Sequence, residues 1–454
     1  MFKENIYISR RKILSNQINE GVILLPGNMP VPMNYPSNTL RFRQDSNFLY
    51  YCGLDYPNLT IVIDTINDET TLFGDDLDVD DIVWEGERVT IKKMAESSGI
   101  EHVEKNSSLP QFLSNKNKIH TLPAYRDDQK SFLKSILGTQ NFSSSKELIV
   151  SVIKQRSIKS DEEVYEIERA IEVTAEMHKI AMKHTHDGVK EQVIVGKMEG
   201  YALERGHRMA YPAIFTIHGE ILHNNVYDNK MKSGQLALND SGSESPLHYA
   251  SDITRTFPVS GSFSEIQKQI YSLVFEMQEV ALTYCKPGIS YKEAHLAAAK
   301  KAVDGLIDIG LMCGSSNEAV AAGAHALFFP HGLGHMLGLD VHDMEGLGED
   351  LVGYDDDSSR SNQFGLAYLR LSKDLEPGFV LTVEPGIYFI PHLIEKWRND
   401  KKHSSFINYD VLSQFENFGG IRIEDNILIT DDGYRMLGPT IPKTVDDIES
   451  LMLS

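Results

Sequence analysis

The stretch SGQLALNDSGSESPLHYASDITRTFPVSG, residues 233–261, indicates how the second half of the chain folds. Two strand-like runs flank a middle that is rich in turn-forming residues, a pattern typical of a β-hairpin. Asp240 lies near the end of the first run, and Asp252 lies on the second. The stretch therefore predicts two carboxylates that face each other across paired strands.

Two further apolar runs carry acidic residues. GFVLTVEPGIYF, residues 378–389, predicts a strand that ends at Glu384, where Pro-Gly stops the apolar run. GGIRIEDNILIT, residues 419–430, alternates strictly, so Arg422 and Glu424 share one face of a strand while isoleucines fill the other. An arginine and a glutamate are thus expected beside the core.

Three histidines lie close together in PHGLGHMLGLDVH, residues 330–342. Glycine is unfavourable inside a helix and no glutamate follows the first histidine, so a zinc helix of the HExxH kind is not expected. An irregular segment or a short strand fits better, and His331, His335 and His342 then need not point the same way. A single histidine is more often structural than a ligand, so the other candidate ligands decide its role.

Each acid has an ordinary alternative, as a turn residue, an edge charge or half of a surface ion pair. Together they favour another interpretation, because an ionised carboxylate in or beside an apolar strand is costly unless it is paired or metal-bound. Two divalent cations would neutralise the four carboxylates, and the imidazole of His335 would add a fifth ligand. The proposed ligands are Asp240, Asp252, Glu384, Glu424 and His335.

The predicted ligand set suggests both the metal and the chemistry. Oxygen-rich coordination with one nitrogen favours manganese, with cobalt, iron or zinc as alternatives. Two metals roughly 3.5–4 Å apart can share a bridging hydroxide, polarise a carbonyl and stabilise the tetrahedral intermediate of hydrolysis. The sequence therefore predicts a dinuclear hydrolase that acts on an amide bond.

Composition limits the class of protein and its partners. The chain has 454 residues, 41% of them hydrophobic and 24% charged, which suits two or three globular domains. Its net charge of −21 argues against nucleic acid and anionic membranes as partners. The opening residues lack the apolar core of a signal peptide, no apolar run is long enough to span a bilayer, and three widely spaced cysteines suit reduced thiols, so a cytoplasmic protein is expected.

Two domains are predicted, residues 1–155 and 156–454. The first alternates strand-like runs with helical ones, which predicts an α/β domain with a mixed sheet. The predicted strands are GVILLPG, SNFLYYCGL, LTIVIDT and TTLFGDD, and the helices are VTIKKMAESSG and DQKSFLKSIL. In the second domain, a capping box of Ser160 and Glu163 opens a long helix, and further helices are predicted at 264–285 and 290–310.

The motifs, taken in order, resemble the pita-bread metallopeptidases, and within them aminopeptidase P and prolidase. The resemblance covers most of residues 160–454 and is carried by ILH, NDSG, SDITRTFPV, HGLGHMLGLDVH, VLTVEPGIY and GIRIEDNILIT. In the first half, YPSNTLRFRQDSNFLYYCGL and VWEG resemble the amino-terminal domain of aminopeptidase P and creatinase. The resemblance implies a creatinase-type α/β domain followed by a pita-bread α+β catalytic domain.

The resemblance also implies an Xaa-Pro aminopeptidase, which cleaves before a proline at the second position of a peptide. Asp240, Asp252 and Glu424 would hold one metal, and Asp252, His335, Glu384 and Glu424 the other. Glu384 would also assist proton transfer.

The remaining implied site residues bind the substrate. His223, His331 and His342 would line the cleft, and Arg422 would orient Glu424 or meet a substrate carboxylate. Trp84 in VWEG would reach the cleft of a neighbouring subunit, since family members form dimers or tetramers.

Three alternatives remain open at this point: a prolidase that cleaves only dipeptides, a metal-free enzyme like creatinase, and a binding module that has lost catalysis. The chain also departs from the family pattern. AIFTIHGEILHNN is shorter than the expected glycine-rich loop, and Asn239 replaces the usual apolar residue before Asp240. The charged segment 389–418 is interpreted as a lid or an oligomer contact, and EDLVGYDDDSSR, residues 349–360, as a solvated loop.

Overall fold

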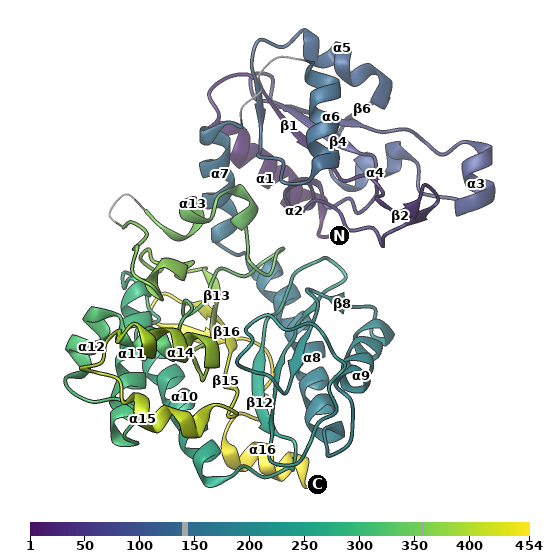
Figure 1. Ribbon diagram of the computed structural model, residues 1–454. Helices are drawn as coiled ribbons and strands as arrows, with labels where there is room; N and C mark the ends of the chain where they lie inside the picture. The colour runs from purple at the N-terminus through teal and green to yellow at the C-terminus, as the bar shows by residue number, and fades with distance from the viewer. Residues whose placement is uncertain (139–143, 356–357) are drawn as a thin grey trace. The chain divides into compact units, whose positions relative to one another are not determined.

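A computed structural model describes residues 1–138, 144–355 and 358–454. The chain forms two compact units (Figure 1). The first comprises Met1–Arg156 with Gly346–Gly348, and the second comprises Ser157–Glu345 with Glu349–Ser454.

The first unit is built on a sheet of five strands, β1 (Val22–Pro26), β4 (Thr60–Asp64), β5 (Glu69–Phe73), β6 (His102–Glu104) and β7 (Ile119–Thr121). Their order is β6-β5-β4-β1-β7. Strands β1, β4 and β5 pair antiparallel, whereas β7 is parallel to β1 and β6 is parallel to β5. The predicted mixed sheet is therefore confirmed.

Helices cover this sheet. A core of leucine, valine and phenylalanine side chains joins the sheet to α5 (Leu109–Ser114) and α6 (Asp127–Leu137). The two predicted helices are confirmed as α4 (Ile91–Ser97) and α6. The unit also contains α1 (Glu4–Gln17), α3 (Val79–Glu85), α7 (Lys146–Ser157), the short helix η1 (Asn106–Ser108) and the hairpin of β2 (Pro32–Tyr35) and β3 (Asn38–Thr39).

The run SNFLYYCGL is a helix, α2 (Ser46–Cys52), and the prediction of a strand there is wrong. The Asp45 carboxylate accepts hydrogen bonds from the backbone N–H groups of Asn47 and Phe48, and Gly53 ends the helix with φ of 67°. Every residue of α2 is buried, so the run shows no polar face that would mark it as helical. The caps at its two ends decide the structure.

Besides one pairing of two-residue strands, the second unit contains two three-stranded sheets and a strand pair beside them. One sheet has the order β12-β10-β9, and its strands are β9 (Ile214–Thr216), β10 (Leu236–Asp240) and β12 (Thr254–Pro258). The other has the order β13-β16-β17, with β13 (Val380–Val383), β16 (Asp425–Ile429) and β17 (Tyr434–Met436). The pair consists of β14 (Gly386–Tyr388) and β15 (Gly420–Arg422).

Two pairs of helices flank these strands (Figure 1). Helices α10 (Glu265–Leu282) and α11 (Tyr291–Asp308) pack on each other, and α10 lies against β13, β14 and β15. Helices α8 (Asp161–His184) and α9 (Glu191–Glu204) form the other pair. The predicted helices at α8, α10 and α11 are confirmed, including the capping box of Ser160 and Glu163.

The predicted hairpin is more elaborate than a simple turn. Strands β10 and β12 pair antiparallel, as expected, but the chain between them forms β11 (Ser243–Glu244), which pairs with β8 (Arg208–Met209). The segment predicted as a solvated loop begins as a short helix, α13 (Glu349–Gly353), so that prediction is wrong there, and residues 356–357 of it lie outside the described residues. Within the described parts of the chain, no helix is long and apolar enough to cross a membrane.

Candidate metal centre

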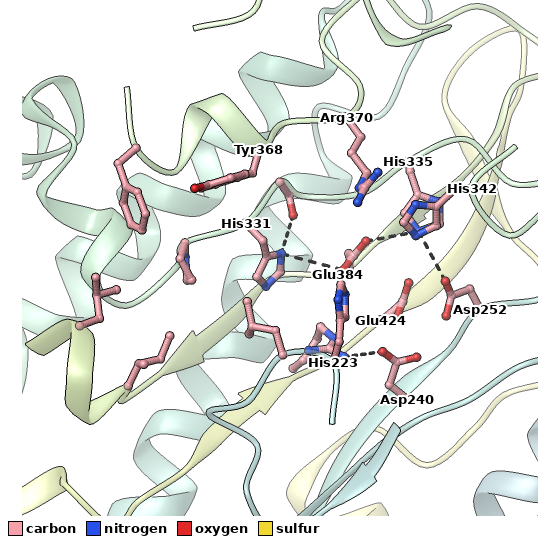
Figure 2. A pocket seen from close by; sticks show the side chains of 18 of the residues that line it. His223, Asp240, Asp252, His331, His335, His342, Tyr368, Arg370, Glu384 and Glu424 are labelled. Atoms are coloured by element: carbon pink, nitrogen blue, oxygen red, sulfur yellow. Dashed lines mark hydrogen bonds and ion pairs between the residues drawn. The ribbon is translucent and has the colours of Figure 1, made fainter. Parts of the chain in front are cut away.

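The second unit holds a pocket of about 640 Å³ that is open on one side. Every residue assigned from the sequence to this chain's own site lines it, and Figure 2 labels all of them except Arg422. These residues are His223, Asp240, Asp252, His331, His335, His342, Glu384, Arg422 and Glu424. Segments that are about 200 residues apart in the chain (223 to 424) therefore meet in one cavity.

The four acids lie where strands begin or end. Asp240 is the last residue of β10, and Asp252 precedes β12. Glu384 directly follows β13, and Glu424 lies in the break between β15 and β16. The predicted continuous strand is interrupted at that break, but Arg422 and Glu424 both face the pocket, as expected.

The strand pairing around Thr254 determines which of the acids lie next to each other. Thr254 is opposite Asp240 in the β10–β12 ladder, and it also forms an isolated bridge with Glu424. Its hydroxyl donates a hydrogen bond of 2.7 Å to the Glu424 Oε2 atom. One threonine thus holds acids from two sheets beside each other.

His335 is oriented by its own backbone. Its Nδ1 atom lies 3.0 Å from the Met336 carbonyl oxygen, so Nδ1–H donates and Nε2 faces the acids. Nε2 lies 3.4 Å from Asp252 Oδ2 and 3.5 Å from Glu384 Oε1. One ligand atom from each of Asp252, His335 and Glu424 lies within 4.8 Å of the other two, a spacing that fits a metal ion.

The pKa shifts of the cluster indicate that its carboxylates lack a compensating positive charge. Burial raises the pKa of Glu424 well above its usual value, and the neighbouring Asp252 and Glu384 raise it further. Burial also raises the pKa of Asp240, despite the nearby Arg422. Burial alone would lower the pKa of His335, but Asp252 and Glu384 raise it to about 9.

One oxygen of the cluster has no partner. Within the described residues, the buried Oε1 atom of Glu424 accepts no hydrogen bond. A buried carboxylate oxygen without a donor is costly, and a cation would satisfy it. The residues therefore fit divalent metal ions in both charge and donor type.

Arg422 contacts Asp240 rather than Glu424. Its NH2 group forms a close ion pair with Asp240 Oδ2, and NH1 donates to the Tyr388 hydroxyl at 2.9 Å. Its Nε donates to the Thr254 hydroxyl at 3.1 Å, so the link to Glu424 runs through Thr254.

The three histidines predicted to contact the substrate differ in their partners. His331 donates Nδ1–H to the Gly332 carbonyl at 2.7 Å, and its Nε2 accepts from the Tyr388 hydroxyl at 2.8 Å. His342 donates Nδ1–H to Glu345 at 3.1 Å and stacks on His335 with 4.0 Å between ring centroids. His223 is exposed at the edge of the pocket.

Tyr211 is a site residue that was not predicted from the sequence. Its hydroxyl lies 2.6 Å from Asp240 Oδ1 and also contacts Asp252 Oδ1 closely. Burial and these two carboxylates raise the pKa of Tyr211 well above its usual value, so the hydroxyl stays a donor. Tyr211 precedes β9 in an irregular stretch, where no periodicity indicates which way a side chain points.

The outer wall of the pocket is apolar, with cations among its residues. Apolar and aromatic side chains come from Leu222, Phe364, Tyr368, Ile390 and Leu393. Arg370 and Lys396 add positive charge. Part of the charged segment 389–418 forms α14 (Pro391–Asn399), which carries Leu393 and Lys396, so this segment borders the pocket.

Comparison with known proteins gives matches over almost the whole chain. Residues 165–431 match the model of metallopeptidase family M24, and residues 7–122 match that of the aminopeptidase P N-terminal domain. A probable Xaa-Pro aminopeptidase of Fusarium vanettenii is 33% identical over 442 residues, covering 95% of this chain and 92% of that protein. The Xaa-Pro dipeptidase of Mus musculus is 32% identical over 444 residues, covering 95% and 88% respectively.

Solved structures match equally well. A variant of Escherichia coli aminopeptidase P in complex with substrate has a TM-score of 0.83 at 29% identity, covering 100% of this chain and 98% of that chain. Zn-substituted E. coli aminopeptidase P in complex with product has a TM-score of 0.82 at 30% identity, with the same coverage.

Proposed function

The chain belongs to metallopeptidase family M24, and from this premise we propose that it is an Xaa-Pro aminopeptidase, which hydrolyses the bond between an N-terminal residue and a following proline. The expected fold, an aminopeptidase P-type N-terminal domain and a pita-bread catalytic domain, is confirmed by the family and structural matches. The single observation that carries the proposal is the convergence of four carboxylates and one imidazole in one pocket. We assign catalysis to residues 156–454, which contain every residue of this cluster, and treat residues 1–155 as an accompanying domain.

We propose that two divalent cations, manganese in the first place, occupy the cluster. Asp240, Asp252 and Glu424 would hold one ion, and Asp252, His335, Glu384 and Glu424 the other. The count of four carboxylates against two double charges supports this number, and the oxygen-rich donor set supports manganese over a thiolate-preferring metal. When bound, such ions supply the positive charge that polarises the scissile carbonyl and activates water.

Glu384 is the group that moves a proton. It is half-buried at the end of β13, with Oε1 3.4 Å from the Thr382 hydroxyl and Oε2 3.9 Å from His331 Nδ1. A carboxylate placed in this way accepts the proton of the attacking water and delivers it to the departing proline nitrogen.

His342 is placed to contact the reacting carbonyl. Because Nδ1–H is engaged by Glu345, Nε2 is the ring nitrogen left for the substrate. Burial and the neighbouring His335 lower the pKa of His342, so its ring is neutral at rest, whereas the Glu345 carboxylate favours the imidazolium form. Once protonated, Nε2–H donates a hydrogen bond to the oxygen on which charge develops. Both ring nitrogens of His331 have protein partners, so His331 would give up its hydrogen bond with Tyr388 to bind the substrate.

A second candidate, an Xaa-Pro dipeptidase, is favoured by one observation. Arg370 and Lys396 put cations on the pocket wall, and a dipeptide has a free carboxylate on its proline. The dipeptidase of Mus musculus is also similar to this chain. The two activities differ only in where the substrate carboxylate lies.

We further propose a cytoplasmic homodimer or homotetramer. Helix α3 has no buried residue, and its Val79, Val83 and Trp84 are 75%, 73% and 87% exposed. Exposed apolar groups of this kind are typical of an interface, for which a second copy of the chain is the proposed partner. The three cysteines are free, as suits a reducing compartment.

Substrate assays test the function. The manganese-loaded protein should release alanine from Ala-Pro-Ala and leave Ala-Ala-Ala intact. Equal hydrolysis of both tripeptides, or of neither, would contradict an Xaa-Pro aminopeptidase. Hydrolysis of Ala-Pro alone would instead assign the dipeptidase.

A further inference from the structure

The guanidinium of Arg370 faces the pocket, but its charge is already paired. Figure 2 shows the side chain reaching toward His342 and Glu384. Its NH1 group forms a close ion pair with Glu345 Oε2 and lies 3.3 Å from Glu349 Oε2. A cation on a pocket wall normally binds a substrate carboxylate. Because these two acids already pair with Arg370, its attraction for such a carboxylate is weaker.

The surrounding charges leave a surplus of acid. Arg360 pairs with Glu349 and lies 2.7 Å from Asp350, so two guanidinium groups serve three carboxylates, those of Glu345, Glu349 and Asp350. Glu345 is the least exposed of the three, with 19% of its side chain accessible against 36% for Glu349 and 68% for Asp350. Solvent screens the charge of the least exposed carboxylate least, so Glu345 contributes most to the repulsion of an anion near Arg370.

Glu345 also keeps one oxygen free. Oε2 accepts both Arg370 and the Nδ1–H of His342, whereas Oε1 is buried and accepts no hydrogen bond from any described residue. A substrate carboxylate that approached Arg370 would therefore meet a guanidinium whose charge Glu345 already offsets, in a cluster with one carboxylate in excess. Such an approach is unfavourable.

We propose that Glu345 determines specificity by excluding a free carboxylate on the proline of the substrate. The inference rests on the proposed Xaa-Pro hydrolysis and concerns the same pocket. In a dipeptide the carboxylate belongs to the proline itself, whereas in a longer peptide it lies at least one residue further from the scissile bond. Glu345 thus favours longer peptides over dipeptides.

The test compares Ala-Pro with Ala-Pro-NH2, two substrates that differ only in the carboxylate. The readout is the ratio of their kcat/KM values, in which any effect on chemistry common to both substrates cancels. Glu345→Gln removes the charge but keeps an oxygen that accepts from His342. We expect it to raise the ratio in favour of Ala-Pro by about five- to tenfold, the effect of one partly buried charge.

Two further variants show whether the rise in the ratio depends on Arg370. The double variant Glu345→Gln with Arg370→Gln should not show the raised ratio, because it has no guanidinium at position 370 that could bind the substrate carboxylate. Arg370→Gln alone should lower the ratio below that of the unaltered protein, since Glu345 and Glu349 lose their partner. The matched control is Asp350→Asn, which removes a carboxylate of the same cluster that does not touch Arg370 and should leave the ratio unchanged.

An unchanged ratio in Glu345→Gln with normal metal content would overturn the proposal, as would an equal rise in Asp350→Asn. If Glu345→Gln does not fold, an undiminished ratio in Arg370→Gln would overturn it instead. These outcomes all require an active parent enzyme. Failure of the unaltered protein to cleave Ala-Pro-Ala would contradict the proposed function and not this inference.

Discussion

At the scale of single residues, the histidines of the segment 330–342 differ in what holds their rings. His335 has its Nδ1–H fixed by a carbonyl and its Nε2 directed at Asp252 and Glu384. His342 stacks on His335 but turns its Nδ1 away to Glu345. The first geometry suits a metal ligand, and the second suits a group that contacts substrate.

His335→Ala and His342→Ala should therefore fail in different ways. Loss of His335 removes the only nitrogen donor of the proposed ligand set, so bound metal and activity should fall together. Loss of His342 should lower kcat roughly 10²- to 10³-fold with metal content intact, because its hydrogen bond strengthens as charge builds in the transition state. Elemental analysis and Ala-Pro-Ala kinetics on both variants measure the contrast, and full activity in His342→Ala would remove it from the site.

The site residues that the sequence predicts share a physical feature. Asp240, Glu384 and Glu424 stand out because a charge at the end of an apolar run needs a partner. Tyr211 and Glu345 do not end an apolar run: Tyr211 lies in an irregular stretch, and Glu345 begins a short 3-10 helix, η3 (Glu345–Leu347). The contacts of Tyr211 with Asp240 and of Glu345 with Arg370 join residues that are distant in sequence. Their side chains could not be assigned without the structure.

At the scale of elements, strands and capped helices were predictable, whereas α2 was not. Helix α8 shows a polar face, an apolar face and a capping box, so pattern and caps agree. Helix α2 is buried on every side, and only its Asp45 cap and the left-handed Gly53 distinguish it from a buried strand. The added pairing of β11 with β8 could not be predicted, because it joins segments that are distant in sequence.

Helix α11 and the short helix η2 (Ala324–Leu327) bury two histidines, His295 and His325, against each other. Their ring centroids are 6.2 Å apart, and within the described chain none of their ring nitrogens has a hydrogen-bond partner. Burial lowers the pKa of His325 to about 4 and that of His295 well below its usual value. Both rings are therefore neutral in the folded protein.

This pair should make the fold sensitive to acid. Protons bind preferentially to the unfolded chain, so the stability due to neutral His325 is complete above about pH 6.5 and is lost as the pH falls toward about 4. Between pH 7 and pH 5 the unaltered protein should lose about 2 kcal/mol of unfolding free energy through His325, and His325→Leu should not show this loss. Urea denaturation of both proteins at the two pH values measures this, and an identical pH dependence would show that His325 does not titrate on unfolding.

At the scale of the whole molecule, assembly depends on surfaces that the chain leaves exposed. The net charge of −21 opposes association of two copies, so apolar groups favour a self-contact more than charged ones do. Helix α3 offers such a surface in its exposed Val79, Val83 and Trp84.

Val83→Asp together with Trp84→Asp should shift the protein from the oligomer to a single chain. Because both side chains are exposed, the change should leave the fold of each chain intact. Light scattering after size-exclusion chromatography gives the mass, and circular dichroism controls for folding. An unaltered parent that is already monomeric, or a variant that stays oligomeric, would show that α3 is not the interface.

We propose that the buried acids and His335 form a dinuclear metal site on which hydrolysis depends. The most direct measurement removes metal from the purified protein with a chelator, returns manganese stepwise, and follows both bound metal and Ala-Pro-Ala cleavage. We predict an inactive metal-free protein whose activity returns and levels off at two ions per chain. A metal-free protein that cleaves the tripeptide at the full rate would contradict the claim.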